Sequence, residues 1–321
     1  MIGIREQRYG TEIEMTGITR KQAAEALGKL WGTTPNHIGG YTYDKWEIKD
    51  TEGKTWTIMS DSSIHAEKKI GYKRYTDSIT NWHEYRVEMV SPILTYPEQP
   101  KLQEAVRTLR KAGAKANKSC GMHIHIDGAN HTAKSLKNIL SIMYSKEDLL
   151  FKALQVNPDR TYYCQKTRED ILTKIRNTRS LTLPKVAQIW YQDKDWESHT
   201  HQHYDNSRYH AINLHAMFSK GTVEFRLFNS TLHAGEVKAY INLALAISAQ
   251  AINQKGCQMH KTASDNEKFT FRTWLLRLGL NGDEFKTTRD HLLKHLDGNS
   301  AWRYSPEHYP THPQTLALAT A

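Results

Sequence analysis

Hydrophobic and polar positions alternate along several short segments of the chain, and this period of two predicts β-strands. Four such segments stand out, at residues 5–16, 84–90, 120–127 and 222–228. A period near 3.6 residues predicts helices at residues 19–31, 100–116, 132–156 and 234–253. Thr19 is a suitable N-cap for the first of these helices. The mixture predicts an α+β protein whose sheet is backed by helices.

Weaker patterns fill the rest of the chain. Residues 41–60 predict a hairpin, because aromatic and β-branched runs flank a turn at residues 50–53. Residues 157–206 are rich in charge, Tyr and His and predict a short helix within long active-site loops. Another strand is expected at residues 209–216. Two helices near 269–280 and 283–296 follow, and the final residues, 311–321, are expected to fray.

Each of the four strands has one apolar face and one charged face. The charged positions are Glu12 and Glu14; Glu84, Arg86 and Glu88; His123, His125 and Asp127; and Glu224 and Arg226. A single strand of this kind is most simply a half-buried strand with a solvated outer face. The four together hold carboxylates, imidazoles and guanidinium groups without a lysine, which is unusual for a solvated surface. The strand at residues 84–90 is open to a second interpretation, in which Glu84 and Arg86 form an ion pair at the rim of this face.

Carboxylates gathered on one surface raise each other's pKa unless cations neutralise them. Carboxylate oxygens suit Mg²⁺ or Mn²⁺, and an imidazole favours Mn²⁺ slightly. Arginine on the same surface suits a phosphate or a carboxylate group. The charged face therefore has the composition of a phosphoryl-transfer site.

Composition narrows the class of protein. The 321 residues are 38% hydrophobic and 24% charged, as in ordinary globular proteins. No apolar run reaches the length of a membrane span and the first residues lack a signal-peptide pattern, so we expect a cytoplasmic protein. Three scattered cysteines indicate reduced thiols. The net charge of +10 favours anionic partners, which include nucleotides, carboxylate substrates and nucleic acid.

Six motifs, in order along residues 10–231, resemble the amidoligase family, whose carboxylate–amine ligases share the glutamine synthetase fold. The motifs are GTEIE at 10–14, SDSSI at 60–64, EMVSP at 88–92, GMHIH at 121–125, RYHAINL at 208–214 and TVEFRLFNST at 222–231. The resemblance implies a curved antiparallel sheet with helices packed on one face. It also implies a catalytic domain over residues 1–256, with 257–321 as a helical C-terminal extension.

The resemblance further implies roles for individual residues. Glu12, Glu14 and Glu88 would hold magnesium ions that bridge the β- and γ-phosphates of ATP, and a second metal position would use His123 and Glu224. Nucleotide contacts are implied for His125 and Asn213, while Arg160 is a weaker candidate from the loop region. Catalytic positions would be Arg226, which binds the acceptor carboxylate or the transferred phosphoryl group, Arg208, which adds positive charge near the phosphates, and Asp61, which lies near the incoming amine.

The activity that the resemblance implies is ATP- and Mg²⁺-dependent formation of an amide through an acyl phosphate. A metal-dependent hydrolase is an alternative, because His123 and His125 with a nearby glutamate also suit a water-activating metal. A nucleic-acid-binding protein is another, suggested by the positive charge and by 10% aromatic residues. The sequence leaves the substrates and the oligomeric state open.

Some conspicuous residues have simpler interpretations. His199, His201 and His203 alternate as in a transition-metal site, but a mobile and solvated loop is the simpler interpretation. Asp61 is as consistent with a turn at a strand end as with a substrate contact. Cys120 precedes the histidine strand and is assigned no role, because buried cysteines are common.

Overall fold

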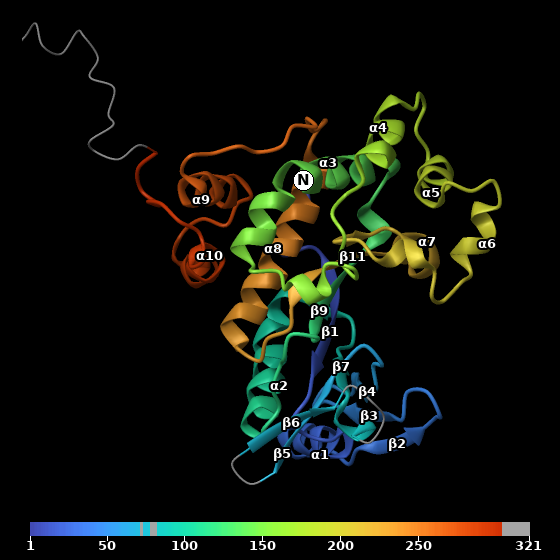
Figure 1. Cartoon of the computed structure of the whole chain (residues 1–321), viewed down its shortest axis with the longest axis vertical. Helices are drawn as coiled ribbons and strands as arrows, with labels where there is room; N and C mark the ends of the chain where they lie inside the picture. The colour runs from blue at the N-terminus through green and yellow to red at the C-terminus, as the bar shows by residue number, and fades with distance from the viewer. Residues whose placement is uncertain (71–72, 78–81, 304–321) are drawn as a thin grey trace, which may run out of the picture.

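A computed structural model describes residues 1–70, 73–77 and 82–303 (Figure 1). Its centre is an antiparallel sheet in the order β10-β11-β9-β1-β7-β4-β3-β2, with β8 also paired to β1. The strands are β1 (Arg8–Met15), β2 (Asn36–Gly39), β3 (Lys45–Lys49), β4 (Thr55–Met59), β7 (Val87–Val90), β8 (Leu94–Thr95), β9 (Gly121–Asp127), β10 (Ile212–Asn213) and β11 (Thr222–Asn229). The protein is thus a mixed α/β protein built on a large antiparallel sheet, as the patterning predicts.

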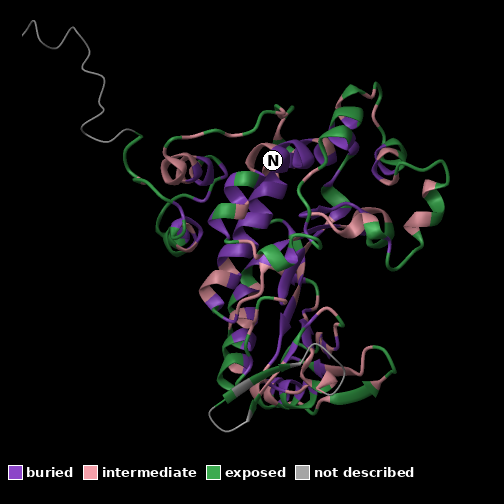
Figure 2. Cartoon of the chain, in the orientation of Figure 1, coloured by how far each residue is buried: buried purple, intermediate pink, exposed green. Residues whose placement is uncertain are grey.

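Helices cover the apolar face of this sheet. Those on this side of the sheet are α1 (Arg20–Trp31), α2 (Gln99–Lys111), α3 (Ala133–Ala153) and α8 (Ala234–Asn253), while α10 (Lys286–Leu293) packs on α8 and α9 (Glu267–Arg277) packs on α10. The inward residues of the strands, such as Ile13, Met89 and Ile124, are fully buried and share one hydrophobic core with these helices. Helix α8 is buried along most of its length between the sheet, α2, α3 and α10 (Figure 2).

Local signals explain where the elements begin and end. Thr19 and Gln22 form a capping box at the start of α1, and Gly32 ends that helix in the left-handed conformation. Helix α7 (His215–Lys220) likewise ends at Gly221 with φ 72°, and β11 starts at the next residue. This tight connection explains how α7 comes to lie beside the sheet face that the large helices leave open.

Three expectations about the elements were wrong. The strand expected at 84–90 begins only at Val87, because residues 83–85 form a 3-10 turn, so Glu84 and Arg86 do not extend the charged face. The strand expected at 209–216 shrinks to β10, because the chain turns into α7. The segment 157–206 holds three helices in place of one, namely α4 (Glu169–Asn177), α5 (Leu183–Tyr191) and α6 (Trp196–Thr200).

Some features fall outside the expected pattern. Strands β5 (Ala66–Ile70) and β6 (Lys73–Asp77) form a separate hairpin. The sequence did not predict it, because the two strands are short and mostly polar. The tail at 311–321 lies outside the described residues. No helix within 1–70, 73–77 and 82–303 combines the length and apolar character that a membrane crossing requires.

Candidate active site

Strand pairing brings the predicted acidic and histidine residues onto one face of the sheet. Glu14 lies opposite Glu88, and Glu12 lies opposite His123. His125 in turn lies opposite Glu224 on β11. Side chains of directly opposed residues project to the same side, so these positions form one continuous surface. The glutamates at 14, 88 and 224 and the imidazole of His123 are all less than a tenth exposed.

The protein's own cations neutralise part of this surface. The two carboxylate oxygens of Glu12 contact His123 Nδ1 at 2.9 Å and His125 Nε2 at 3.1 Å. Glu224 accepts hydrogen bonds of 2.6 Å from Asn213 Nδ2 and from the Arg226 guanidinium. Burial alone would raise the pKa of both glutamates. Charge from His125 and His123 instead holds the pKa of Glu12 well below its usual range, and Arg226 with the two histidines lowers that of Glu224 to about 2.

The other two carboxylates lack this compensation. Burial, together with the charge of Asp61, raises the pKa of Glu14 to about 8 even though the Gly121 amide donates to it at 2.6 Å. Burial and the charges of Glu12 and Asp61 raise the pKa of Glu88 well above its usual range. Among the residues that the structure describes, none donates a hydrogen bond to the Glu88 carboxylate. Such carboxylates favour a bound cation.

The donor atoms fit a divalent cation. Ligand atoms of Glu12, His123 and Glu224 lie within 4.8 Å of one another, and so do those of Glu14, Glu88 and His123. Carboxylate oxygens with one imidazole suit Mg²⁺ or Mn²⁺. In these two groups Glu12 lies with His123 and Glu224, and Glu14 lies with Glu88 and His123.

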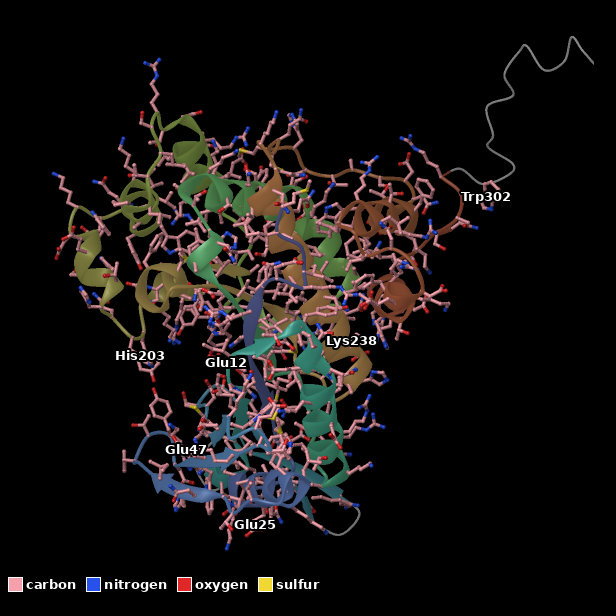
Figure 3. The ribbon with its side chains drawn as sticks, turned by 180° about the vertical axis from the view of Figure 1, so that it is seen from behind. Glu12, Glu25, Glu47, His203, Lys238 and Trp302 are labelled. Atoms are coloured by element: carbon pink, nitrogen blue, oxygen red, sulfur yellow. The ribbon has the colours of Figure 1, made fainter. Side chains whose placement is uncertain are left out.

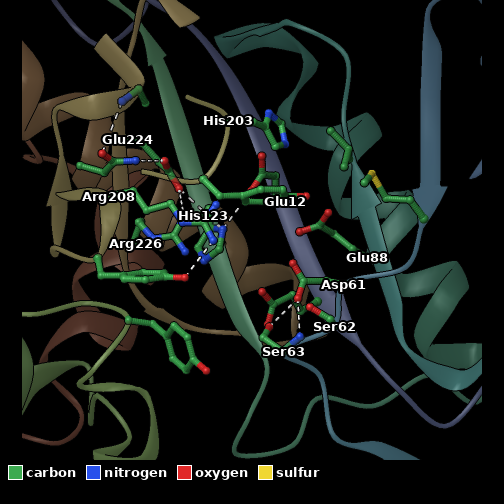
Figure 4. Close-up of a pocket in the computed structure, with 18 of the residues that line it drawn as sticks. Glu12, Asp61, Ser62, Ser63, Glu88, His123, His203, Arg208, Glu224 and Arg226 are labelled. Carbon is green, nitrogen blue, oxygen red and sulfur yellow. Dashed lines mark hydrogen bonds and ion pairs between the residues drawn. The ribbon is translucent and has the colours of Figure 1, made fainter. Parts of the chain in front are cut away.

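A cavity of about 870 Å³ lies over this surface. Its opposite ends differ in charge: in Figure 4 Arg226 and Arg208 lie to one side of His123, while Glu88 and Asp61 lie to the other. The Arg208 guanidinium packs over the rings of Tyr204 and Tyr209 at 4.7 and 4.8 Å. The Nε atoms of Arg208 and Arg226 are buried donors that have no acceptor among the described residues. Such donors fit an anionic ligand.

The structure brings nearly all of the sequence-predicted site residues to this cavity. Those that line it are Glu12, Glu14, Asp61, Glu88, His123, Arg160, Arg208, Asn213, Glu224 and Arg226. His125 is absent from the lining, because its ring lies between Glu12 and the hydroxyl of Thr222. This geometry favours a positioning role for His125 over the expected phosphate contact.

Arg160 is anchored by the backbone. Its guanidinium donates to the carbonyl oxygens of Phe228, at 2.6 Å, and Arg226, at 3.1 Å. The side chain is 3% exposed, and its charge opposes the rise in the pKa of Glu14. Arg160 therefore holds β11 in place in addition to lining the cavity.

Sequence reasoning missed the residues that loops contribute. The Tyr43 hydroxyl contacts Tyr204 and lies 3.3 Å from His203 Nε2, so two loops 160 residues apart meet at the cavity. Lys45, the first residue of β3, and Lys220, the last residue of α7, also line it. Of the three alternating histidines, His199 is fixed by Asp193 and Asp205 instead of lying on a solvated loop. Loop residues carry no periodic signal, which explains why patterning did not find them.

The comparison with protein families agrees with the sequence motifs, and the other comparisons add little. No curated protein matches the chain. Among solved structures, the crystal structure of a bifunctional glutathione synthetase from Pasteurella multocida is similar to this chain, with a TM-score of 0.39 and 11% sequence identity. The match covers 91% of this chain and 48% of that chain. The chain thus spans about half the length of that protein. The family model described as "Putative amidoligase enzyme" matches residues 5–248, so the chain belongs to the amidoligase family.

Proposed function

We propose that this protein is a ligase that uses ATP and Mg²⁺ to join a carboxylate to an amine through an acyl phosphate. Membership of the amidoligase family supports a carboxylate–amine ligase. The finer proposal rests on Glu14 and Glu88, two buried carboxylates whose pKa is raised because little positive charge offsets theirs. They lie beside Glu12 and Glu224, whose charges the two histidines and Arg226 neutralise. This combination suits a site that holds divalent cations and a polyphosphate together.

In this proposal Glu12, His123 and Glu224 hold one cation, and Glu14 with Glu88 holds another. Bound magnesium would offset the negative charge of the ATP phosphates during phosphoryl transfer. Asn213 orients Glu224 through its 2.6 Å hydrogen bond, and His125 orients Glu12. Second contacts of this kind keep ligand atoms in position and raise the affinity for a cation.

The cationic end of the cavity would bind the reacting anions. A substrate carboxylate oxygen would attack the γ-phosphorus and ADP would leave. The amine would then lose the extra proton of its ammonium form to solvent, its nitrogen would attack the acyl carbon, and phosphate would leave while a second proton passes to solvent. Arg226 and Arg208 are the residues that would hold the transferred phosphoryl group, since each has a buried Nε donor to offer. Asp61 lies at the acidic end, where it would hold the ammonium form of the incoming amine. Arg160 adds positive charge near Glu14.

The proposal also extends to the fold of the enzyme, its domain boundaries and its location in the cell. An antiparallel sheet with a charged face and helices on its other face is the arrangement expected of a glutamine synthetase-like domain. We assign residues 1–256 to that domain and treat the helices from residue 257 onward as an addition that packs on α8. A cytoplasmic location, where ATP and magnesium are abundant, suits this chemistry.

The direct test is phosphate release from ATP by the purified protein with Mg²⁺ or Mn²⁺, against a panel of amino acids, peptides and amines. The proposal expects release that specific carboxylate and amine pairs stimulate. Glu12→Gln should lower that release by about a hundredfold or more, because the variant keeps the shape of the side chain and removes its charge. Glu25→Gln, which changes an exposed glutamate on α1, is the matched control and should keep full activity.

Three outcomes would contradict the proposal. Substrate-stimulated release that Glu12→Gln retains would remove the carboxylate surface from the mechanism. Metal-dependent cleavage of an amide or ester without ATP would favour the hydrolase alternative. Salt-sensitive binding of DNA or RNA in the absence of any ATP turnover would favour the nucleic-acid alternative.

A further inference from the structure

A second cavity, of about 590 Å³, lies on the helical side of the sheet. It is formed where the C-terminal half of α2 meets the beginnings of α8 and α10, and Lys238 on α8 marks its position in Figure 3. Its lining consists of Gln103, Arg107, Arg110, Lys111, His233, Ala234, Gly235, Lys238, Glu284, Thr287, Thr288 and His291. None of these residues lines the candidate active site.

The lining concentrates positive charge. Arg107, Arg110 and Lys111 follow one another at helical spacing on a single face of α2, and Lys238 faces them from α8. Like charges at this spacing repel and weaken a helix. No carboxylate among the described residues pairs with any of these four cations. An anionic ligand would remove the repulsion.

The acidic groups near the pocket are already engaged. Glu284 accepts from Arg5 at 2.8 and 2.7 Å and from the Tyr96 hydroxyl at 2.7 Å. Glu236 accepts from the Thr231 hydroxyl at 2.6 Å and from the Lys294 ammonium. These contacts leave the four cations as the uncompensated charge of the pocket.

The backbone adds further donors. Helix α8 is 20 residues long and its first amides, those of Ala234 and Gly235, have no acceptor among the residues described. The positive end of a helix dipole and its free amides favour an anion. Gln103 Nε2 donates to the Ala234 carbonyl at 2.8 Å, which ties the cationic face of α2 to this helix end.

A metal ion suits the pocket less well. Ligand atoms of His233, Glu236 and His291 lie within 4.8 Å of one another. However, both Glu236 oxygens already accept hydrogen bonds, and His233 Nδ1 accepts from the Glu236 amide at 3.3 Å. The four free cations around the pocket would also repel a metal cation.

We propose that this pocket binds a ligand that carries two or more linked phosphate groups and is recognised through those phosphates. Four cations exceed what a single carboxylate requires and match a polyphosphate. Apart from the two histidines the lining has no aromatic ring on which a base could stack, so recognition rests on the phosphates. The phosphates can come from a free oligophosphate or from the backbone of a single nucleic-acid strand. The proposal is independent of the ligase activity.

The test is calorimetric titration of the full-length protein with inorganic tripolyphosphate in the presence of EDTA. We expect Arg107→Gln/Lys238→Gln to weaken binding about tenfold or more, because two charged contacts are lost. Lys29→Gln/Lys134→Gln makes the same change of net charge on exposed parts of α1 and α3 and should bind as the wild type does. All substituted positions are surface residues on helices, and thermal melts verify that each variant is folded.

Further measurements distinguish this pocket from the candidate active site, and a free oligophosphate from a nucleic-acid strand. Arg208→Gln alters the candidate active site and should retain the binding event that the pocket variant loses. Tighter binding of a short single-stranded oligonucleotide than of tripolyphosphate, with the same loss in the pocket variant, would identify a nucleic-acid backbone as the ligand. Weaker binding of the oligonucleotide would identify a free oligophosphate. Wild-type affinity in the pocket variant, or a loss that Arg208→Gln reproduces, would overturn the proposal.

Discussion

At the scale of single residues, several buried polar groups are paired with groups from distant parts of the chain. His131 is a clear case, because its ring nitrogens contact Ser135 Oγ at 3.1 Å and Ser248 Oγ at 2.9 Å. Ser248 in turn donates to Gln7 at 2.6 Å. This network connects the segment before β1 with α3 and α8, and burial lowers the pKa of His131 to about 4.

The pKa of His131 predicts a loss of stability in acid. Below pH 6.5 the unfolded chain protonates this histidine, whereas the folded protein resists protonation until about pH 4. The unfolded state therefore binds more protons in this window, and the free energy of unfolding falls as the pH is lowered. The contribution of His131 reaches about 3 kcal/mol over the whole window. Urea unfolding at a series of pH values measures it.

The variant His131→Gln isolates this contribution. It should be less stable than the wild type at neutral pH and should show a weaker dependence on pH between 6.5 and about 4. His201→Gln, at an exposed position, should leave the pH dependence unchanged. An unaltered pH dependence in His131→Gln would show that other groups cause the acid sensitivity.

At the scale of elements, strand alternation was the signal that located the site. The period of two determines which residues of a strand share a face, and the family motifs follow one another in a fixed order. The charged face at Glu12, His123 and Glu224 was therefore predictable from the sequence. The register between strands was not predictable, because it depends on pairing between residues far apart in the chain. The start of β7 at Val87 and the shortening of β10 were also missed, since turns beside Arg86 and Leu214 override a pattern that fits a strand.

Gly121, at the start of β9, tests how closely these elements pack. A Cβ atom at this position would overlap the guanidinium of Arg160, which is buried and fixed by its hydrogen bonds to β11. Gly121→Ala should therefore lower the free energy of unfolding by about 1–3 kcal/mol. Gly256→Ala is the control, because a Cβ atom there meets open space. Equal stability of the two variants in urea would mean that Arg160 moves aside at little cost.

At the scale of the whole molecule, the helices after residue 257 share the core of the sheet domain. Gln99 on α2 donates to Asn242 on α8 at 2.9 Å, and Asn242 donates to the Thr288 hydroxyl on α10 at 3.0 Å. All three side chains are at most 2% exposed. The C-terminal helices were predictable as helices, but this shared network was not, because it joins residues that are far apart in sequence.

Thr288→Val tests this connection. The change keeps the shape of the side chain and leaves a buried Asn242 amide donor without its acceptor, which should cost about 1–3 kcal/mol in one cooperative unfolding transition. Thr288→Ser retains the hydroxyl and should cost less. Separate transitions for the sheet domain and the C-terminal helices, in denaturant curves followed by two probes, would contradict a shared core.

The central claim is that the carboxylate surface on the sheet binds a nucleotide together with divalent cations. Calorimetric titration with a non-hydrolysable ATP analogue tests it without knowledge of the substrates. The account predicts binding that requires Mg²⁺ or Mn²⁺, that is lost in EDTA, and that falls about tenfold or more in Glu88→Gln. Equal affinity with and without the metal ion, or in wild type and Glu88→Gln, would contradict it.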